Sequence, residues 1–499
     1  MSATITKRKE RLFLLVVYAV FIFGLLIVAR YTSPLYLNNY GGDSAIFMMM
    51  GKSMVAGKVL YVDIFDHKGP VLFFIEAFGY LFGGKIAIFI IECIFGIITI
   101  TSLYHICKLI GTKKNSFSVF SVSAVLVSGF AVFFYTFTGG NLSEEYSLPF
   151  ITVCLYFMTK YVLNAEHSTE HPVWYAFLYG IAISAVFFIR LNNAVTICAG
   201  VLVIFLYLIY KKKFKNLLMN LLFGVFGVAV VTVPIVIYFT YKGALYDMIY
   251  ATFLYNFKYT SASSSVSIFS NLPEYAILYL PVIISFILFF CNLIRNKFKI
   301  QLIDWVVAVS LVVNTASLIL ANQYSHYFTV FVPLYMFVVC IYWKFRLKDV
   351  KTYLIAVCLM LYAFKVLMFS YASVNAYYLN KSTIEVYNTV RNCLSIIPED
   401  EKDSFIGYNL NAGYYMYGDL LPCHKYYILH DWWSKADPSI NTDFLNWLEE
   451  ETPVWIMTPP NEDSMSINET VQNKMSDILE NHYELKDKNK YICLYRVKD

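Results

Sequence analysis

Long apolar runs dominate this sequence and restrict what the chain can fold into. A helix that spans a bilayer needs about 20 apolar residues. Eleven segments approach or reach that length, near residues 12–29, 86–109, 116–137, 146–164, 173–189, 194–210, 217–241, 276–294, 304–321, 327–343 and 353–372. With 59% hydrophobic and only 15% charged residues over 499 positions, the composition lies outside the ordinary soluble class. The sequence predicts an α-helical polytopic membrane protein with about 11 transmembrane helices.

A twelfth apolar run, residues 71–82, decides the predicted topology. It is only twelve residues long and contains Glu76, which suits an interfacial or re-entrant helix better than a span. If this run is not a span, the basic N-terminus and four basic clusters, at 113–114, 211–215, 295–299 and 344–351, all fall on one side of the membrane. Because basic loops stay in the cytoplasm, we expect a cytoplasmic N-terminus in a bacterial inner membrane. The first loop, 30–85, is then extracytoplasmic.

The C-terminal part differs in composition from the rest of the chain. From residue 380 onward long apolar runs stop, and strand-like pieces such as FIGYN and VWIM alternate with helical ones such as ETVQNKMSDILENHY. An odd number of spans places this part outside. We therefore expect a transmembrane catalytic domain at 1–379 and an extracytoplasmic α/β domain at 380–499. A disulfide between two of Cys393, Cys423 and Cys493 is allowed there, although the sequence assigns no pairing.

The charge pattern bears on the partners. The net charge of +5 is small for this length, and the basic residues gather between apolar runs instead of on one face. This excludes nucleic acid as an expected partner and leaves membrane lipids. Acids, bases and an imidazole gather at four loops of the expected outer face. Charge at the edge of a membrane is a functional hypothesis by default. These residues are Asp43, Asp63, Asp66, His67, Lys68, Glu144, Glu145, Arg190, His326 and Tyr327.

The order of these residues resembles that of the GT-C superfamily of polyprenyl-phosphate-sugar-dependent glycosyltransferases. An acid follows the first span, and then come a short helix, the run GKVLYVDIFDHKGP and a second short apolar helix. Bacterial Rgt-like and protein-mannosyltransferase-like members are the most similar in this pattern. The similar residues keep the family's order from residue 40 to residue 335. The resemblance implies two helices on the membrane surface in the first outer loop.

The resemblance also implies roles for residues of the first loop. Asp43 corresponds to the catalytic base. The family usually has Asp-Glu where this chain has Asp43-Ser44, so a second acid at that point is missing. Lys68, in Lys68-Gly69-Pro70, corresponds to the element associated with the carrier phosphate. Asp66 and His67 precede it and are also candidates for binding substrate or carrier phosphate.

Further roles are implied in the later loops. The second acidic motif matches either Glu144 or Glu145, and both are candidate catalytic residues. Arg190 is similar to a basic residue at the outer end of a middle span, and His326 with Tyr327, followed by Pro333, is similar to a His-Tyr element. Arg190, His326 and Tyr327 are thus expected to bind substrate or carrier phosphate.

The chemistry gives these positions a physical reason. A departing lipid phosphate develops negative charge that fixed cations such as Lys68 and Arg190 stabilise. An acceptor hydroxyl that attacks the anomeric carbon needs a carboxylate base, for which Asp43 is the candidate. The expected donor is a polyprenyl-phosphate-linked sugar and the acceptor a cell-envelope glycan, lipid or protein. Some branches of the family use a divalent cation, but the sequence has no convincing metal-ligand spacing, so no cofactor is assigned.

Simpler interpretations stand beside each role. Asp43 could cap a helix, Asp63 and Asp66 could pair with nearby lysines to hold the loop, and Lys68 could extend to ordinary lipid headgroups. His326 fits an interfacial aromatic belt. For the whole chain, the alternative is a polytopic transporter or a lipid-linked-glycan flippase or polymerase. Transporters tend to show related halves and broken helices, and neither is evident in the sequence.

Overall fold

The structure is a computed structural model that describes residues 2–113, 119–165, 169–262, 272–320, 324–342, 382–429, 431–460 and 469–498. The described residues divide into two compact units. The helical unit takes those within 1–29, 89–235 and 265–375, and the mixed unit takes those within 30–88, 236–264 and 376–499. Two helices, α4 (Lys85–Lys113) and α9 (Phe214–Tyr241), contribute residues to both units.

The described part of the helical unit consists mainly of apolar helices. Its elements, besides the parts of α4 and α9, are α1 (Ser2–Val28), α5 (Val119–Thr136), α6 (Ser143–Val162), α7 (Val173–Phe187), η2 (Leu191–Ala194), α8 (Val195–Tyr210), α12 (Leu272–Arg295), α13 (Leu302–Leu320), η5 (Ser325–Phe331) and α14 (Val332–Tyr342).

The mixed unit combines the first loop, the segment after α9 and the C-terminal part of the chain. Its elements are η1 (Pro34–Tyr36), α2 (Gly42–Val55), α3 (Pro70–Phe82), α10 (Leu245–Ile249), the π-helix η3 (Tyr250–Leu254), α11 (Tyr255–Ala262), α16 (Ser382–Leu394), η6 (Glu399–Ser404), β1 (Phe405–Gly407), α17 (Gly413–Tyr417), α18 (Asp431–Ala436), α19 (Ser439–Glu451), β2 (Trp455–Thr458), α20 (Glu469–His482), β3 (Tyr483–Lys488) and β4 (Cys493–Val497).

The predicted multi-pass membrane protein is confirmed. Among the described residues, seven helices are long and apolar enough to cross a membrane: Arg8–Val28, Lys85–Gly111, Leu191–Tyr210, Phe214–Tyr241, Ile277–Arg295, Leu302–Leu320 and Ser325–Tyr342. Each corresponds to one of the eleven expected spans. Three others coincide with α5, α6 and α7, which fall outside these seven, and the expected span 353–372 lies outside the described residues. The 13-residue helix α3 is too short to span, as its sequence predicted.

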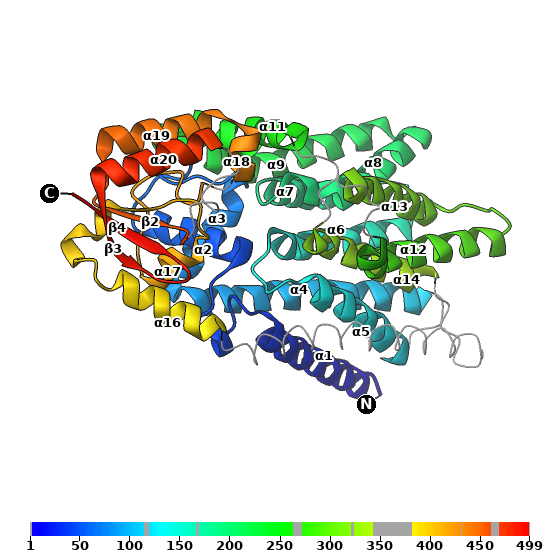
Figure 1. Ribbon diagram of the computed structural model, residues 1–499. Helices are drawn as coiled ribbons and strands as arrows, with labels where there is room; N and C mark the ends of the chain where they lie inside the picture. The colour runs from blue at the N-terminus through cyan, green and yellow to red at the C-terminus, as the bar shows by residue number, and fades with distance from the viewer. Residues whose placement is uncertain are drawn as a thin grey trace. The chain divides into compact units, whose positions relative to one another are not determined.

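A small mixed sheet forms in the C-terminal part, where the sequence predicts strands. The strand order is β1-β2-β4-β3, with β1 parallel to β2 and the other neighbours antiparallel. The two strands β1 and β2 are buried along their whole length, as expected for apolar strands covered on both faces. Figure 1 shows α19 and α20 beside this sheet. Cys393, Cys423 and Cys493 are all free, so the allowed disulfide is not formed.

Small residues let helices of the helical unit approach closely. A Cβ atom added to Gly180 would lie 2.0 Å from the carbonyl oxygen of Gly224, and one on Gly227 would lie 2.1 Å from that of Phe177. The backbones of α7 and α9 therefore touch where they cross, as small-residue packing in membranes allows.

The mixed unit is built on α2 and α3, the two short helices expected in the first loop. A Cβ atom on Gly51 of α2 would lie 2.6 Å from Cβ of Glu76 in α3, so only glycine fits this crossing. On the other side of the loop, the ring of Phe65 packs against those of Tyr255, Tyr426 and Trp433 at 5.3–5.4 Å between centroids. The unit thus joins three stretches of chain that are far apart in sequence.

Candidate functional site

Asp43 lies in the first turn of α2, in the mixed unit. The N-cap of α2 is Gly41, and no side chain caps this end of the helix. Asp43 is therefore not the capping residue that a simpler interpretation allowed. An acid in the first turn still interacts favourably with the helix dipole. The Asp43 carboxylate is half-buried, and within the described part of the chain it has no hydrogen bond or ion pair. It is therefore available to a ligand.

Lys85 fixes the chain just before Asp43. Its ammonium group is buried and donates hydrogen bonds to the carbonyl oxygens of Tyr36, Leu37 and Asn39, the last at 2.7 Å. It also lies 4.6 Å from the centroid of the Tyr40 ring. An ammonium has three N–H donors, so these carbonyls take all of them. Lys85 thus holds the loop that leads into Asp43, a role that the sequence did not reveal.

Asp63 holds a tight turn through the backbone, not through the lysine pairing that the sequence suggested. Its carboxylate accepts a 2.6 Å hydrogen bond from the backbone N–H of Val59. Within the same turn Tyr61 has a φ of 71°, which is uncommon for a residue with a side chain. The hydroxyl of Tyr61 donates to the carbonyl oxygen of Lys68 at 2.7 Å. The turn therefore positions the segment that carries Lys68.

Asp66, His67 and Lys68 form one compact group. Oδ1 of Asp66 accepts from the backbone N–H of Lys68 at 3.0 Å and lies 3.6 Å from the Lys68 ammonium. His67 Nδ1 is 4.0 Å from the same oxygen. Asp66 is fully buried, whereas the Lys68 side chain keeps 10% of its surface exposed. Lys68 is thus a nearly buried cation whose orientation Asp66 sets.

The position of Lys68 relative to α2 is the central geometric fact of this group. Its ammonium lies 5.1 Å from the centroid of the Phe47 ring. Phe47 follows Asp43 by four positions in α2, and residues i and i+4 share one face of a helix. The structure therefore brings the predicted base and the predicted phosphate-binding cation to the same face of α2.

The segment after α9 contacts His67, the middle residue of the group Asp66, His67 and Lys68. The amide of Asn256 donates to the carbonyl oxygen of His67 at 2.7 Å, and the His67 ring packs against Tyr255 and Tyr259. Burial raises the pKa of Tyr255, whose hydroxyl therefore stays a neutral donor and binds the carbonyl of Trp433 at 3.1 Å. Asn256 is a second residue that sequence reasoning missed.

The remaining predicted residues lie in the helical unit, beside a strained turn. Thr138, Gly139, Gly140 and Asn141 all have positive φ, of 46°, 110°, 90° and 59°. Such conformations are unfavourable for a β-branched threonine. Glu92, in α4, accepts a 2.6 Å hydrogen bond from the backbone N–H of Asn141 and so holds the turn.

Glu145 and Glu144 contact different partners. Glu145 contacts the carboxyl group of Glu92. Glu144 instead forms an ion pair with Arg190 and accepts a 3.0 Å hydrogen bond from the Ser143 hydroxyl. Glu144, and not Glu145, is thus the acid that pairs with Arg190.

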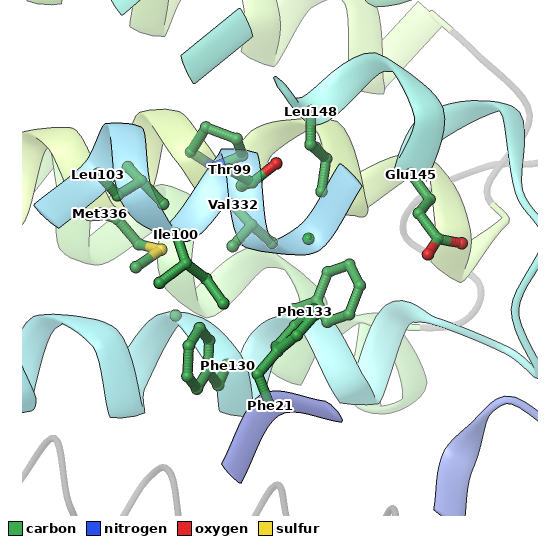
Figure 2. Close-up of a pocket in the computed structure, with 13 residues that line it drawn as sticks. Phe21, Thr99, Ile100, Leu103, Phe130, Phe133, Glu145, Leu148, Val332 and Met336 are labelled. Carbon is green, nitrogen blue, oxygen red and sulfur yellow. The ribbon is translucent and has the colours of Figure 1, made fainter. Parts of the chain in front are cut away.

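Glu145 also borders an apolar cavity in the helical unit. Figure 2 shows Phe21, Phe130 and Phe133 together on one side of it and Glu145 apart from them. The lining is apolar except for Thr99 and Glu145, so the cavity offers few hydrogen bonds to a polar ligand.

Arg190, Tyr327 and His326 lie together in the helical unit. The guanidinium carbon of Arg190 lies 3.8 Å from the centroid of the Tyr327 ring, a close cation–π contact. The His326 ring packs edge-on against Tyr327 at 4.7 Å and stacks on Tyr324 at 5.6 Å. The predicted residues thus form two groups, one in each unit. Among the described residues, no three His, Cys, Asp or Glu side chains are grouped so as to hold a metal ion.

Comparisons with known proteins support the fold. Residues 2–353 match the family model described as "Putative competence-induced protein Ccs4 N-terminal domain". The crystal structure of ArnT from Cupriavidus metallidurans bound to undecaprenyl phosphate has a TM-score of 0.59 and 11% identity, over 97% of this chain and 97% of that chain. ArnT is a GT-C glycosyltransferase, so the GT-C fold is confirmed. No curated protein matches the chain.

Proposed function

The chain belongs to the family of putative competence-induced proteins described by the Ccs4 N-terminal domain, and from this premise we propose that it is a membrane glycosyltransferase. It would transfer a sugar from a polyprenyl-phosphate donor to an extracytoplasmic cell-envelope acceptor. The similarity to ArnT, solved with undecaprenyl phosphate, supports the donor class. The observation that carries this proposal concerns one face of α2. Asp43 and Phe47 lie on that face, and the Lys68 ammonium lies against the Phe47 ring.

The proposed reaction follows from this face. An acceptor hydroxyl attacks the anomeric carbon of the sugar, and Asp43 takes the proton as the new C–O bond forms. The bond between that carbon and the phosphate oxygen breaks, and the lipid phosphate leaves with an added negative charge. The ammonium of Lys68 stabilises this charge, while Asp66 and the Tyr61 hydroxyl keep Lys68 in place.

Replacement of the base tests the proposal. Asp43→Asn keeps the shape of the side chain but removes its basicity. With an undecaprenyl-phosphate-linked radiolabelled hexose in membranes that hold the cell-envelope acceptors, we expect at least a 100-fold lower rate of transfer, the typical contribution of a general base. The measurement is label in the acceptor fraction.

The matched control is Asp419→Asn in the same unit. Asp419 pairs with Lys52 at 2.7 Å, but its side chain is 91% exposed, and exposed pairs contribute little. This variant should transfer sugar at the unmutated rate. Unchanged transfer by Asp43→Asn would refute the assigned base. Movement of the lipid-linked sugar across a vesicle without transfer to any acceptor would favour the flippase alternative.

A further inference from the structure

A second pocket in the helical unit differs in chemistry from the apolar cavity beside Glu145. It is partly open to solvent. Its polar lining comes from the turn between α7 and α8, from the end of α13 and from η5. These residues are Arg190, Asn192, Asn193, Asn314, Ser317 and Tyr327. Only Arg190 and Tyr327 belong to the family pattern, so the amides and the Ser317 hydroxyl extend the site.

The charge of this pocket is already balanced. Arg190 contributes a guanidinium group, but Glu144, which is 1% exposed, forms an ion pair with it. The Tyr327 ring covers a face of the same guanidinium. A phosphate dianion bound here would have to compete with a buried carboxylate that no solvent screens. The pocket therefore suits an uncharged ligand better than the carrier phosphate that Arg190 was expected to bind.

The side chains that remain are donors and acceptors of neutral hydrogen bonds. The Asn193 amide nitrogen donates to the Ser143 carbonyl and to the Ser147 hydroxyl, which leaves its amide oxygen as an acceptor. Asn192 is exposed and offers both ends of its amide. Several amides and a hydroxyl around one small space match the alternating donors and acceptors of a ring of hydroxyl groups.

Asn314 is the informative residue of this set. It lies in α13, one of the helices apolar enough to span a membrane, and is 5% exposed. A buried polar residue in such a helix is costly and usually functional. Its amide oxygen accepts from Thr196 in α8 at 3.0 Å and its nitrogen donates to the Ser310 carbonyl at 2.7 Å. These bonds hold the amide at the pocket wall.

We propose that this pocket binds the hydroxyl groups of an uncharged sugar ring, with Asn192, Asn314 and Ser317 as its specificity-determining residues. The inference rests on the proposed glycosyltransferase function and assigns its sugar to the helical unit. The sugar could belong to the lipid-linked donor or to a glycan acceptor, because both present the same hydroxyl chemistry.

The binding of simple glycosides to the full chain tests the proposed sugar pocket directly. The full chain in lipid nanodiscs is titrated with the methyl glycosides of glucose, galactose, mannose and N-acetylglucosamine, followed by saturation-transfer NMR. We expect wild-type protein to bind at least one of them and the double variant Asn192→Ala/Ser317→Ala to bind it about tenfold more weakly, as the loss of two hydrogen bonds implies. Asn164→Ala, an exposed asparagine of the same unit, is the control and should bind unchanged.

A second pair of variants separates binding from packing. Thr196→Val and Asn314→Val both remove the hydrogen bond between α8 and α13, but only Asn314→Val removes an amide from the pocket. Weaker glycoside binding in Asn314→Val alone supports the proposal. Equal binding by the two variants would show that Asn314 serves packing, and wild-type affinity in the double variant, or no glycoside binding by the wild type, would overturn the pocket assignment.

Two further experiments identify the source of the sugar and test the pocket separately from the proposed glycosyltransferase function. Displacement of the glycoside by undecaprenyl-phosphate-linked hexose, but not by undecaprenyl phosphate alone, assigns the donor sugar, and simultaneous binding assigns the acceptor. If the wild type binds glycosides but transfers no sugar, the pocket stands and the proposed function fails. If the double variant transfers sugar with unchanged KM for both substrates, the function stands and the pocket fails.

Discussion

At the residue scale, the ion pair of Arg190 and Glu144 shows how burial changes the value of a charge. Glu144 is 1% exposed and Arg190 is 19% exposed, so neither ion has much water to replace its partner. A pair of this kind can add little net stability while it is intact, yet removal of one member leaves the other charge buried and uncompensated. The ion pair therefore matters for stability mainly when one of its two members is removed.

This asymmetry makes a prediction about Arg190. Arg190→Met should lower the free energy of unfolding by about 3–5 kcal/mol, because Glu144 loses its counter-ion. The double variant Arg190→Met/Glu144→Gln should recover much of that loss, since no buried charge remains. The measurement is thermal unfolding of the purified protein in detergent.

The control for this prediction is an exposed ion pair of the same unit. Lys213 lies 3.8 Å from Glu170, and the two side chains are 39% and 68% exposed. Lys213→Met should shift the unfolding midpoint very little. An Arg190→Met protein as stable as its double variant would contradict the assigned role of the pair.

At the scale of elements, Asp437 links the segment after α9 to the C-terminal part of the mixed unit. It accepts hydrogen bonds from Tyr250 in the π-helix η3, from Lys258 in α11 and from Ser439 in α19. Burial alone would raise the pKa of Asp437, but these hydrogen bonds outweigh it and lower the pKa from 3.8 to about 2. π-helical turns often occur where function requires an irregular helix, and Asp437 fastens this one.

The lowered pKa predicts how the mixed unit responds to acid. A carboxyl group whose pKa is lower in the folded state stabilises the fold above its unfolded pKa, and this contribution is lost as the pH falls through the folded value. For Asp437 the loss should occur between about pH 4 and pH 2. We expect about 1–2 kcal/mol, reduced from the full pKa shift because Lys258 is half-exposed and screened by solvent.

Thermal unfolding at stepped pH in a non-ionic detergent measures this loss. Asp437→Asn should be less stable than the wild type at pH 6 and should show a flatter decline between pH 4 and pH 2. Asp443→Asn, an exposed position on α19, should follow the wild-type curve. Parallel curves for the wild type and Asp437→Asn would reject the assigned link.

At the scale of the whole molecule, the positive-inside pattern predicts the orientation of the chain in the membrane. We expect a cytoplasmic N-terminus and an extracytoplasmic C-terminal part. Alkaline phosphatase fused after residue 499 should be active, because it folds only outside the cytoplasm, whereas a fusion at the basic turn 211–213 should be inactive. Fusions of green fluorescent protein should give the opposite result. An inactive phosphatase at residue 499 would mean an even number of spans.

The sequence predicted the two short helices of the first loop and two of the four strands of the sheet. The two helices correspond to α2 and α3, and FIGYN and VWIM correspond to β1 and β2. These elements have strong local patterns: short apolar runs bounded by glycine or proline. Asp43 and Lys68 were found through family order, and Glu144 and Glu145 were left as alternatives, because adjacent acids in a sequence do not reveal which partner each meets.

The sequence by itself determined that the chain spans the membrane repeatedly and that its polar residues interrupt the apolar helices at a few loops. Both follow from the cost of placing polar groups in hydrocarbon. Only the tertiary structure decided that Glu144 meets Arg190, that Glu92 meets Glu145 and that Lys68 lies over the face of α2 that carries Asp43. Such contacts join residues up to 53 positions apart, and their energies depend on burial, which no local pattern encodes.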